Sequence, residues 1–221
     1  MGARALVLDF GGPVLLTPFE LVGDRRGTPV HELLFGRGPL ATVAAPDLDW
    51  TELQEGRITE RAYWAHRARE WHGAGGAGPD ISAMMAHLYE PARPQLVREQ
   101  ARTLIRDARA AGHPVAILTN DLRAFHSQEW VDEIEIVGDV DVLVDGSVEG
   151  YLKPDRRLYQ VLADRLGVDF VDMVFLDDQM TNIRGAQALG IPSVWFDPAA
   201  PDAGFDAVRI LLGLPEEEPH G

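Results

Sequence analysis

Short apolar runs alternate with amphipathic stretches over much of this 221-residue chain. Mostly apolar runs of roughly four to eight residues are typical of strands buried on both faces of a sheet. Such runs occupy residues 5–10, 114–118, 140–144, 173–176 and 193–196. Apolar positions at helical spacing follow them, at residues 97–108, 154–166, 182–189 and 205–212. Strands that alternate with helices predict an α/β fold, with a parallel Rossmann-like sheet covered by helices on both faces.

The segment from residue 16 to residue 92 follows a different pattern, into which short helical stretches fit. They cover residues 31–35, 46–54, 59–71 and 80–88. Thr28, Thr59 and Asp80 stand where N-caps are expected. We therefore predict an all-helical cap domain at residues 16–92, inserted into an α/β core domain of residues 1–15 and 93–214.

Three further features of the chain refine this picture. Trp50, Trp64 and Trp71 are expected to form the core of the helical cap. The glycine-rich segment 73–78 predicts a flexible loop within the cap, and no Lys-Ser/Thr pair follows it as in a phosphate-binding loop. The acidic tail at residues 215–221 is expected to be disordered.

Polar residues stand at the ends of the three clearest strands. Asp9 ends the first, Thr119 and Asn120 follow the second, and Asp177 and Asp178 end the third. Lys153 lies in a loop before a helix, from which it can reach the same edge. Since the carboxyl ends of parallel strands meet at one edge of the sheet, we expect these groups to converge.

Three carboxylates at one edge repel each other and require a cation. The single lysine cannot neutralise them, whereas Mg²⁺ binds carboxylate oxygens and keeps positions open for phosphate oxygens. The loop of Phe10, Gly11 and Gly12 would offer free backbone N–H groups to phosphoryl oxygens, together with the Asn120 N–H and the Thr119 hydroxyl. Such a set of groups suits phosphoryl transfer, with a carboxylate as the nucleophile.

Composition and charge exclude several other classes of protein. The chain carries 20 Lys and Arg against 35 Asp and Glu, a net charge of −15, which disfavours nucleic acid and anionic membranes. It contains no cysteine, so thiolate catalysis and Cys-based zinc sites are excluded. No apolar run is long enough for a membrane span, and the N-terminal one is too short for a signal peptide. We expect a soluble cytoplasmic protein, as a monomer or a homodimer.

Four motifs, in this order along the chain, resemble those of the haloacid dehalogenase superfamily, in its phosphatase-like branch with a helical C1-type cap. They are DFGGPV at residues 9–14, ILTN at 117–120, KPD at 153–155 and FLDD at 175–178. Asn182 follows the last motif as a possible outer partner. The resemblance extends over nearly the whole chain.

The resemblance implies a role for each residue at the strand ends. Asp9 looks like the nucleophile and a ligand of Mg²⁺, and the Gly11 carbonyl and Asp178 look like further ligands. Asp177 would orient Lys153 or a water on the metal. The phosphoryl oxygens would be held by Thr119 and Lys153.

Two positions depart from the family pattern. Phosphatases of the family usually carry a second Asp, as acid and base, where this chain has Gly11. The chain also has Pro13 where Thr or Val is usual, which removes one N–H. Without an acid at Gly11, substrates with good leaving groups should react best.

The resemblance implies a Mg²⁺-dependent phosphohydrolase that acts on a small phosphorylated metabolite through an aspartyl phosphate. One alternative is a 2-haloacid dehalogenase, since such enzymes also lack the second Asp, although they work without a metal. Another is a catalytically weak binding or regulatory protein of the same fold, an interpretation that Gly11 motivates.

Overall fold

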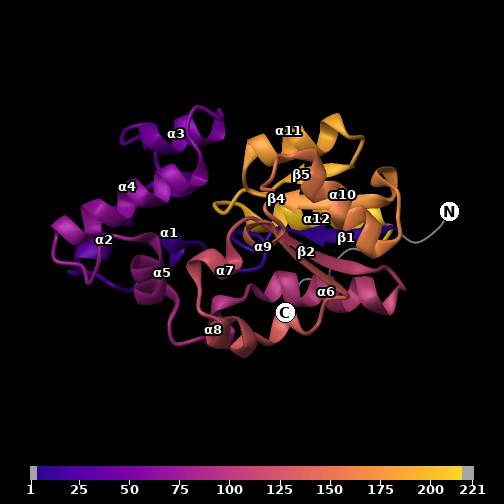
Figure 1. Cartoon of the computed structure of the whole chain (residues 1–221), viewed down its shortest axis with the longest axis horizontal. Helices are drawn as coiled ribbons and strands as arrows, with labels where there is room; N and C mark the ends of the chain where they lie inside the picture. The colour runs from indigo at the N-terminus through magenta and orange to yellow at the C-terminus, as the bar shows by residue number, and fades with distance from the viewer. Residues whose placement is uncertain (1–3, 216–221) are drawn as a thin grey trace.

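The computed structural model describes residues 4–215, so the expected disordered tail lies outside the described residues beyond Pro215. The strands form one parallel sheet in the order β3-β2-β1-β4-β5, as Figure 1 shows. They are β1 (Ala5–Leu8), β2 (Val115–Thr119), β3 (Val142–Asp145), β4 (Met173–Asp177) and β5 (Ser193–Trp195). The predicted α/β fold is therefore confirmed.

Helices cover both faces of the sheet, because successive residues of each strand point to opposite sides. Leu6 and Leu8 of β1 pack into one cluster, which includes residues of α6 (Glu99–Ala110) and α12 (Pro201–Leu212). Val7 packs into the other, with residues of α10 (Arg156–Leu166) and α11 (Met180–Ala188). The predicted buried parallel strands thus supply side chains to two separate cores.

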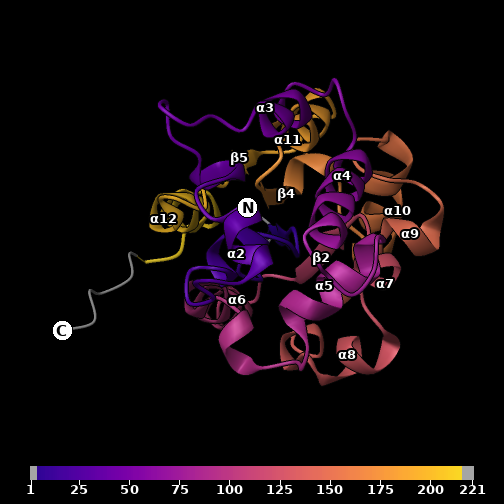
Figure 2. The same cartoon turned by 90° about the vertical axis from the view of Figure 1, so that its left-hand side faces the viewer.

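Helices also occupy the segment that was predicted to be a cap. They are α1 (Pro18–Leu21), α2 (Pro29–Leu34), α3 (Leu48–Gln54), α4 (Glu60–Gly73) and α5 (Ile81–Tyr89). The predicted N-caps are confirmed, since the side chains of Thr28, Thr59 and Asp80 each accept a hydrogen bond from a backbone N–H. Figures 1 and 2 show these helices together at one end of the molecule, beyond the carboxyl ends of the strands. Whether they form a separate domain stays a prediction.

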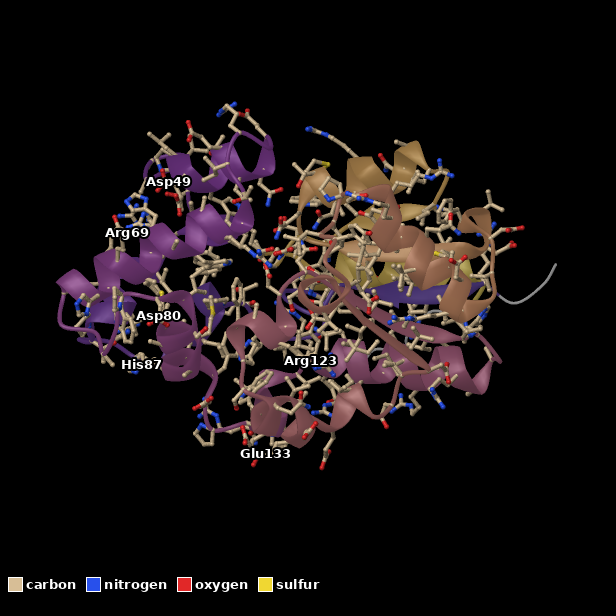
Figure 3. All side chains as sticks on the ribbon, in the orientation of Figure 1. Asp49, Arg69, Asp80, His87, Arg123 and Glu133 are labelled. Atoms are coloured by element: carbon tan, nitrogen blue, oxygen red, sulfur yellow. The ribbon has the colours of Figure 1, made fainter. Side chains whose placement is uncertain are left out.

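Aromatic and charged residues hold α3 and α4 together. Trp64 and Trp71 are buried, while Trp50 is half-buried and packs edge-on against Phe19. Asp49 of α3, labelled in Figure 3, accepts a hydrogen bond from the Arg67 guanidinium of α4 at 2.6 Å. The buried tryptophans belong to the same hydrophobic cluster as Leu6 and Leu8 of β1, so the helical segment shares its core with one face of the sheet.

The shortest elements lack enough residues to show a period. The structure adds α7 (Leu122–Phe125), α8 (Gln128–Glu133) and α9 (Gly146–Glu149). Single turns of 3-10 helix lie at Gly38–Leu40, Pro94–Leu96, Glu135–Val137 and Phe170–Asp172. Within residues 4–215, no helix is both long and apolar enough to cross a membrane.

The two connections of the helical segment lie side by side. Leu16 N–H donates to the Leu96 carbonyl at 2.8 Å, and Arg98 N–H donates to the Val14 carbonyl at 2.9 Å. Leu15 and Val97 form an antiparallel bridge between them. The chain therefore enters and leaves this segment through a short two-stranded connection.

Hydrogen bonds hold the start of the glycine-rich segment after α4. Gly75 N–H donates to the His72 carbonyl at 3.0 Å, and Gly76 N–H donates to the Trp71 carbonyl at 2.9 Å. A Cβ on Gly76 would lie 2.3 Å from the Trp71 indole. Residues 74–76 therefore close the helix as a hydrogen-bonded turn, whereas the flexibility expected for residues 73–78 stays a prediction.

Gly76→Ser should destabilise the protein, because the Trp71 ring would have to move inside a packed core. Overpacking of this kind typically costs about 1–3 kcal/mol, and the thermal midpoint of unfolding measures it. Gly73→Ser is the matched control, since a Cβ on Gly73 has no atom within 4 Å. Equal midpoints for the two variants would contradict the prediction.

Candidate active site

The three predicted carboxylates converge at the edge of the sheet. Asp9 follows β1, whereas Asp177 ends the neighbouring β4 and Asp178 comes next. The register of the two strands brings Asp9 level with the end of β4, because Asp9 N–H donates to the Leu176 carbonyl at 2.9 Å. One oxygen from each carboxylate lies within 4.8 Å of the others. The expected cluster is therefore present, and it is buried.

Lys153 supplies a positive charge within this cluster. Its Nζ lies 2.7 Å from Asp9 Oδ1 and 2.7 Å from Asp177 Oδ2, and it donates to the Leu118 carbonyl at 2.9 Å. The side chain is 1% exposed. Its backbone N–H donates to Asn120 Oδ1 at 2.7 Å, which fixes the loop that carries it. All three ammonium protons thus have protein acceptors. A phosphoryl oxygen could bind the ammonium only by sharing a proton with one of these acceptors or by displacing the acceptor.

Burial and mutual repulsion set the protonation of these groups. Burial raises the pKa of Asp9 above its usual range, against the lowering effect of the Lys153 ammonium, and Asp177 adds to the rise. Burial raises the pKa of Asp178 well above its usual value, and Asp9 and Asp177 raise it further. Burial alone would lower the pKa of Lys153, but Asp177 and Asp9 outweigh it and raise that pKa.

Asp177 is fully occupied by contacts with the protein. Besides Lys153, it accepts hydrogen bonds from the Gln179 N–H at 2.7 Å and from Asn182 Nδ2 at 3.1 Å. Asn182 is therefore an outer partner of the cluster, as its place after the fourth motif suggested. These contacts hold Asp177 in place, because both of its carboxylate oxygens accept hydrogen bonds from the protein.

Asp178 lies against the loop that follows β1. A Cβ on Gly12 would lie 3.1 Å from the Asp178 carboxylate, and Gly12 has a φ of +90°. Only glycine suits that combination of left-handed backbone and close approach. Gly12 thus allows Asp178 to approach the carboxylate of Asp9.

The loop offers fewer free N–H groups than expected. Phe10 N–H donates to Asp9 Oδ1 at 2.7 Å, and Gly12 N–H donates to the Leu15 carbonyl at 3.0 Å. Among the described residues, Gly11 N–H is the one of the three for which no acceptor is found. The expectation of several free donors is therefore wrong for Phe10 and Gly12 in this conformation. Pro13 removes no bond, because the turn closes through its neighbours.

Thr119 and Asn120 lie beside the carboxylates, as expected, and line the same cavity. The next residue, Asp121, is held by α4, since Arg61 Nε donates to both of its carboxylate oxygens at 3.0 and 3.1 Å. Gln54 of α3 makes a second contact of this kind, because its Nε2 donates to the Asp178 carbonyl at 3.2 Å. The helical segment therefore contacts residues that follow two of the motif strands, one through its side chain and one through its backbone.

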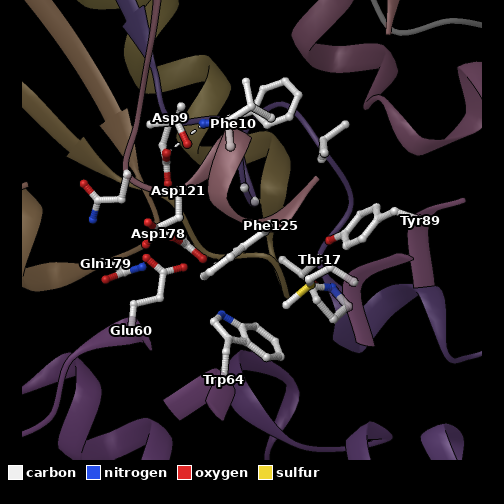
Figure 4. Close-up of a pocket in the computed structure, with 18 of the residues that line it drawn as sticks. Asp9, Phe10, Thr17, Glu60, Trp64, Tyr89, Asp121, Phe125, Asp178 and Gln179 are labelled. Atoms are coloured by element: carbon white, nitrogen blue, oxygen red, sulfur yellow. Dashed lines mark hydrogen bonds between the residues drawn. The ribbon is translucent and has the colours of Figure 1, made fainter. Parts of the chain in front are cut away.

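The cavity between the sheet edge and the helical segment contains one acid that the sequence did not indicate. Figure 4 shows Glu60 of α4 beside Gln179 and Asp178, opposite the loop that carries Asp9 and Phe10. Burial raises the pKa of Glu60, and a hydrogen bond from Gln179 opposes the rise. An acid in the first turn of a helix ordinarily complements the helix dipole, so its position in the sequence gave no further signal.

The donors of the cluster fit a divalent cation. Asp9 and Asp178 provide hard carboxylate oxygens at the cavity, and the Gly11 carbonyl belongs to the same loop. One ammonium faces three buried carboxylates, and burial first, then repulsion between the carboxylates, raises the pKa values of Asp9 and Asp178. The residues present therefore suit Mg²⁺.

Comparison with known proteins agrees with this geometry. The profile of a family described as haloacid dehalogenase-like hydrolase matches residues 31–190. Acyl-CoA dehydrogenase family member 10 of Mus musculus is 32% identical over 113 residues, which are 50% of this chain and 10% of that protein. A phosphatase of Mycobacterium tuberculosis is 31% identical over 97 residues, 44% of this chain and 45% of that protein. The chain thus spans less than half the length of these two relatives.

One relative and two solved structures match over more of the chain. The phosphoserine phosphatase of Thermus thermophilus is 26% identical over 195 residues, 86% of this chain and 74% of that protein. The HAD-hydrolase YfnB of Bacillus subtilis, bound to magnesium, has a TM-score of 0.66 at 15% identity, over 97% of this chain and 100% of its own. The L-2-haloacid dehalogenase of Xanthobacter autotrophicus has a TM-score of 0.55 at 16% identity, over 88% of this chain and 78% of its own. At these identities, the two structures show a shared fold.

Lys153→Arg should destabilise the protein, because a planar guanidinium cannot direct three N–H bonds to the same three oxygens in this space. We expect a loss of about 1–3 kcal/mol, and more for Lys153→Met, which leaves two carboxylates unpaired. Urea denaturation measures both. Arg157→Lys is the control, because Arg157 is paired with Asp155 on the surface. Wild-type stability of Lys153→Arg would show that the fit of the ammonium is not required.

Proposed function

The chain belongs to the haloacid dehalogenase-like hydrolases, and from that premise we propose that it is a Mg²⁺-dependent phosphohydrolase of a small phosphorylated metabolite. The observation that carries the proposal is the cluster of Asp9, Asp178 and Lys153, in which Asp9 and Asp178 border the cavity. The phosphatase names of two relatives support it. Phosphate release from p-nitrophenyl phosphate, with Mg²⁺ and with EDTA, is the direct test.

In the proposed reaction, an Asp9 oxygen attacks phosphorus and the ester oxygen leaves with its alcohol. This forms an aspartyl phosphate. Water then attacks the phosphorus, which releases inorganic phosphate and restores the Asp9 carboxylate. In this proposal Lys153 keeps Asp9 oriented, and the Gly11 N–H and Thr119 hydroxyl, which line the cavity, would donate to phosphoryl oxygens.

Mg²⁺ would be held by Asp9, Asp178 and the Gly11 carbonyl. When bound, it supplies positive charge to the phosphoryl oxygens and offsets the repulsion among the carboxylates. Asp177 contributes indirectly, because it fixes Lys153 through a 2.7 Å contact.

The absence of an acid at Gly11 bears on which esters react. Asp121 and Asp177 are the nearest acids in the motifs, but the first is paired with Arg61 and the second with Lys153. We propose that the enzyme favours leaving groups whose oxygen is already acidic, such as aryl or acyl phosphates.

We also propose that α1–α5 act as a cap that opens to admit substrate. Opening would separate Arg61 from Asp121 and Gln54 from the backbone at Asp178 and Met180. These contacts lie at the cavity, so closure would also exclude water from it.

Gly11 favours one competing function, 2-haloacid dehalogenation, in which the leaving halide needs no proton. A chloroacetate assay beside the phosphatase assay separates the two. Full activity on chloroacetate in EDTA, without phosphate release, would replace the phosphohydrolase proposal. Absence of both activities would favour a binding or regulatory role.

Asp178→Asn should weaken Mg²⁺ binding and lower kcat strongly, by about a hundredfold, because it removes one of the charges that hold the cation. Calorimetric titration with Mg²⁺ and steady-state kinetics measure the two effects. Asp172→Asn is the control, since Asp172 is exposed just before β4. Unchanged Mg²⁺ affinity in Asp178→Asn would contradict the assignment.

Gly11→Asp should raise the rate on alkyl phosphates about tenfold, less than a fully placed acid provides. The site has room, because a Cβ on Gly11 meets no atom within 4 Å. Gly11→Asn is the matched control, with the same size and no acid. The measurement is kcat/KM against the pKa of the leaving alcohol. For the wild type, kcat/KM should fall steeply as that pKa rises. A flat wild-type plot would show that another acid acts, and Glu60→Gln would then test the carboxyl nearest in the cavity.

A further inference from the structure

The cavity has two walls of opposite character. At the sheet edge are the polar groups of the reaction, led by Asp9 and Asp178. The remaining lining is largely aromatic and apolar, with side chains from α1, α3, α4, α5 and α7. It includes Phe19, Trp50, Trp64, Met85, Tyr89 and Phe125. Figure 4 shows Trp64 and Phe125 across the cavity from Asp9.

The aromatic side chains of the apolar wall present few polar atoms to the cavity, and the buried His126 Nδ1 has no hydrogen-bond partner among the described residues. The Tyr89 hydroxyl donates to the Leu16 carbonyl at 2.9 Å. His126 stacks on Trp130 with ring centres 4.0 Å apart, and burial lowers its pKa to about 4, so its imidazole is neutral at neutral pH. A ligand in this part of the cavity therefore meets mainly uncharged ring faces.

No lysine or arginine is among the described residues that line the cavity. The cations that contact residues of the lining are already paired with acids, since Arg61 binds Asp121, Lys153 binds Asp9 and Asp177, and Arg98 binds Glu20. The acids Glu60 and Asp121 do line it. A carboxylate or a second phosphate at this place would find no counter-ion, and it would lose its hydration beside two acids.

The direction of attack places the leaving group against the apolar wall. In phosphoryl transfer, the attacking and leaving oxygens lie roughly in line through phosphorus. With Asp9 as the nucleophile, the leaving oxygen points away from β1 and towards α4 and α7. The alcohol part of the substrate therefore enters the space beside Trp64 and Phe125.

We propose that the alcohol part of the substrate is an uncharged apolar or aromatic group, and that esters whose alcohol carries a carboxylate or a second phosphate are rejected. This inference rests on the proposed phosphohydrolase function. Aryl phosphates meet both requirements of the site, because their ring suits the apolar wall and their oxygen leaves without an acid.

The test compares aryl phosphates whose phenols have matched pKa values and carry a neutral ester, a carboxylate or a trimethylammonium group. Matching the pKa removes the effect of the leaving oxygen. We expect kcat/KM for the neutral compound to exceed that for the carboxylate by at least about tenfold. Equal or higher values for the carboxylate or the ammonium compound would overturn the inference. No phosphate release from any ester would instead overturn the proposed function.

A charge-gain variant tests the same point from the side of the protein. Phe125→Arg places a cation in the apolar wall and should improve the carboxylate compound about tenfold relative to the neutral one. Phe35→Arg is the matched control, because Phe35 is 56% exposed at the end of α2, and it should leave the ratio unchanged. An unchanged ratio in a folded Phe125→Arg would contradict the inference. If that variant does not fold, the wild-type series decides alone.

Discussion

The ammonium of Lys153, shared by two buried carboxylates, is the interaction on which the site depends. Each carboxylate comes from a different strand, and the lysine comes from a loop before α10. Removing any one partner would leave an uncompensated charge in a space closed to water. The cluster therefore ties the central strands β1 and β4 to the loop before α10.

Because the charged groups of the cluster must stay close together, neighbouring residues hold them with hydrogen bonds. Asn120 fixes the backbone of Lys153, and Asn182 and the Gln179 N–H hold Asp177. Arg98 plays a corresponding part outside the cluster, because it donates to the Gly12 carbonyl and to Glu20. Asn120, Asn182 and the Gln179 N–H thus limit the movement of charged groups without adding another charge, whereas Arg98 brings a charge that Glu20 pairs.

The sequence predicted the sheet and the converging residues because parallel strands bring their carboxyl ends to one edge. That rule, together with the motifs, was enough to predict that Asp9, Thr119, Lys153 and Asp177 come together. Glu60 was missed because its place in a helix has an ordinary explanation, and its neighbours in the cavity are distant in the chain. The hydrogen bond from the Phe10 N–H to Asp9 could not be predicted either, since it depends on the rotamer of the Asp9 side chain. At Gly76, composition suggested flexibility, whereas the contact with Trp71 comes only from packing.

The paired connections of the helical segment affect how the insertion can be exchanged during evolution. Because Leu16 is bonded to Leu96, and Val14 to Arg98, the ends of the insertion are already neighbours. The entropy of closing a loop grows only slowly with its length, so replacing the insertion by a longer or shorter one costs the core little. Phe19, Trp64 and Tyr89 all lie inside the exchangeable part, whereas Asp9 and Lys153 lie outside it. The apolar lining of the cavity and the carboxylate cluster can therefore diverge at different rates within one continuous polypeptide.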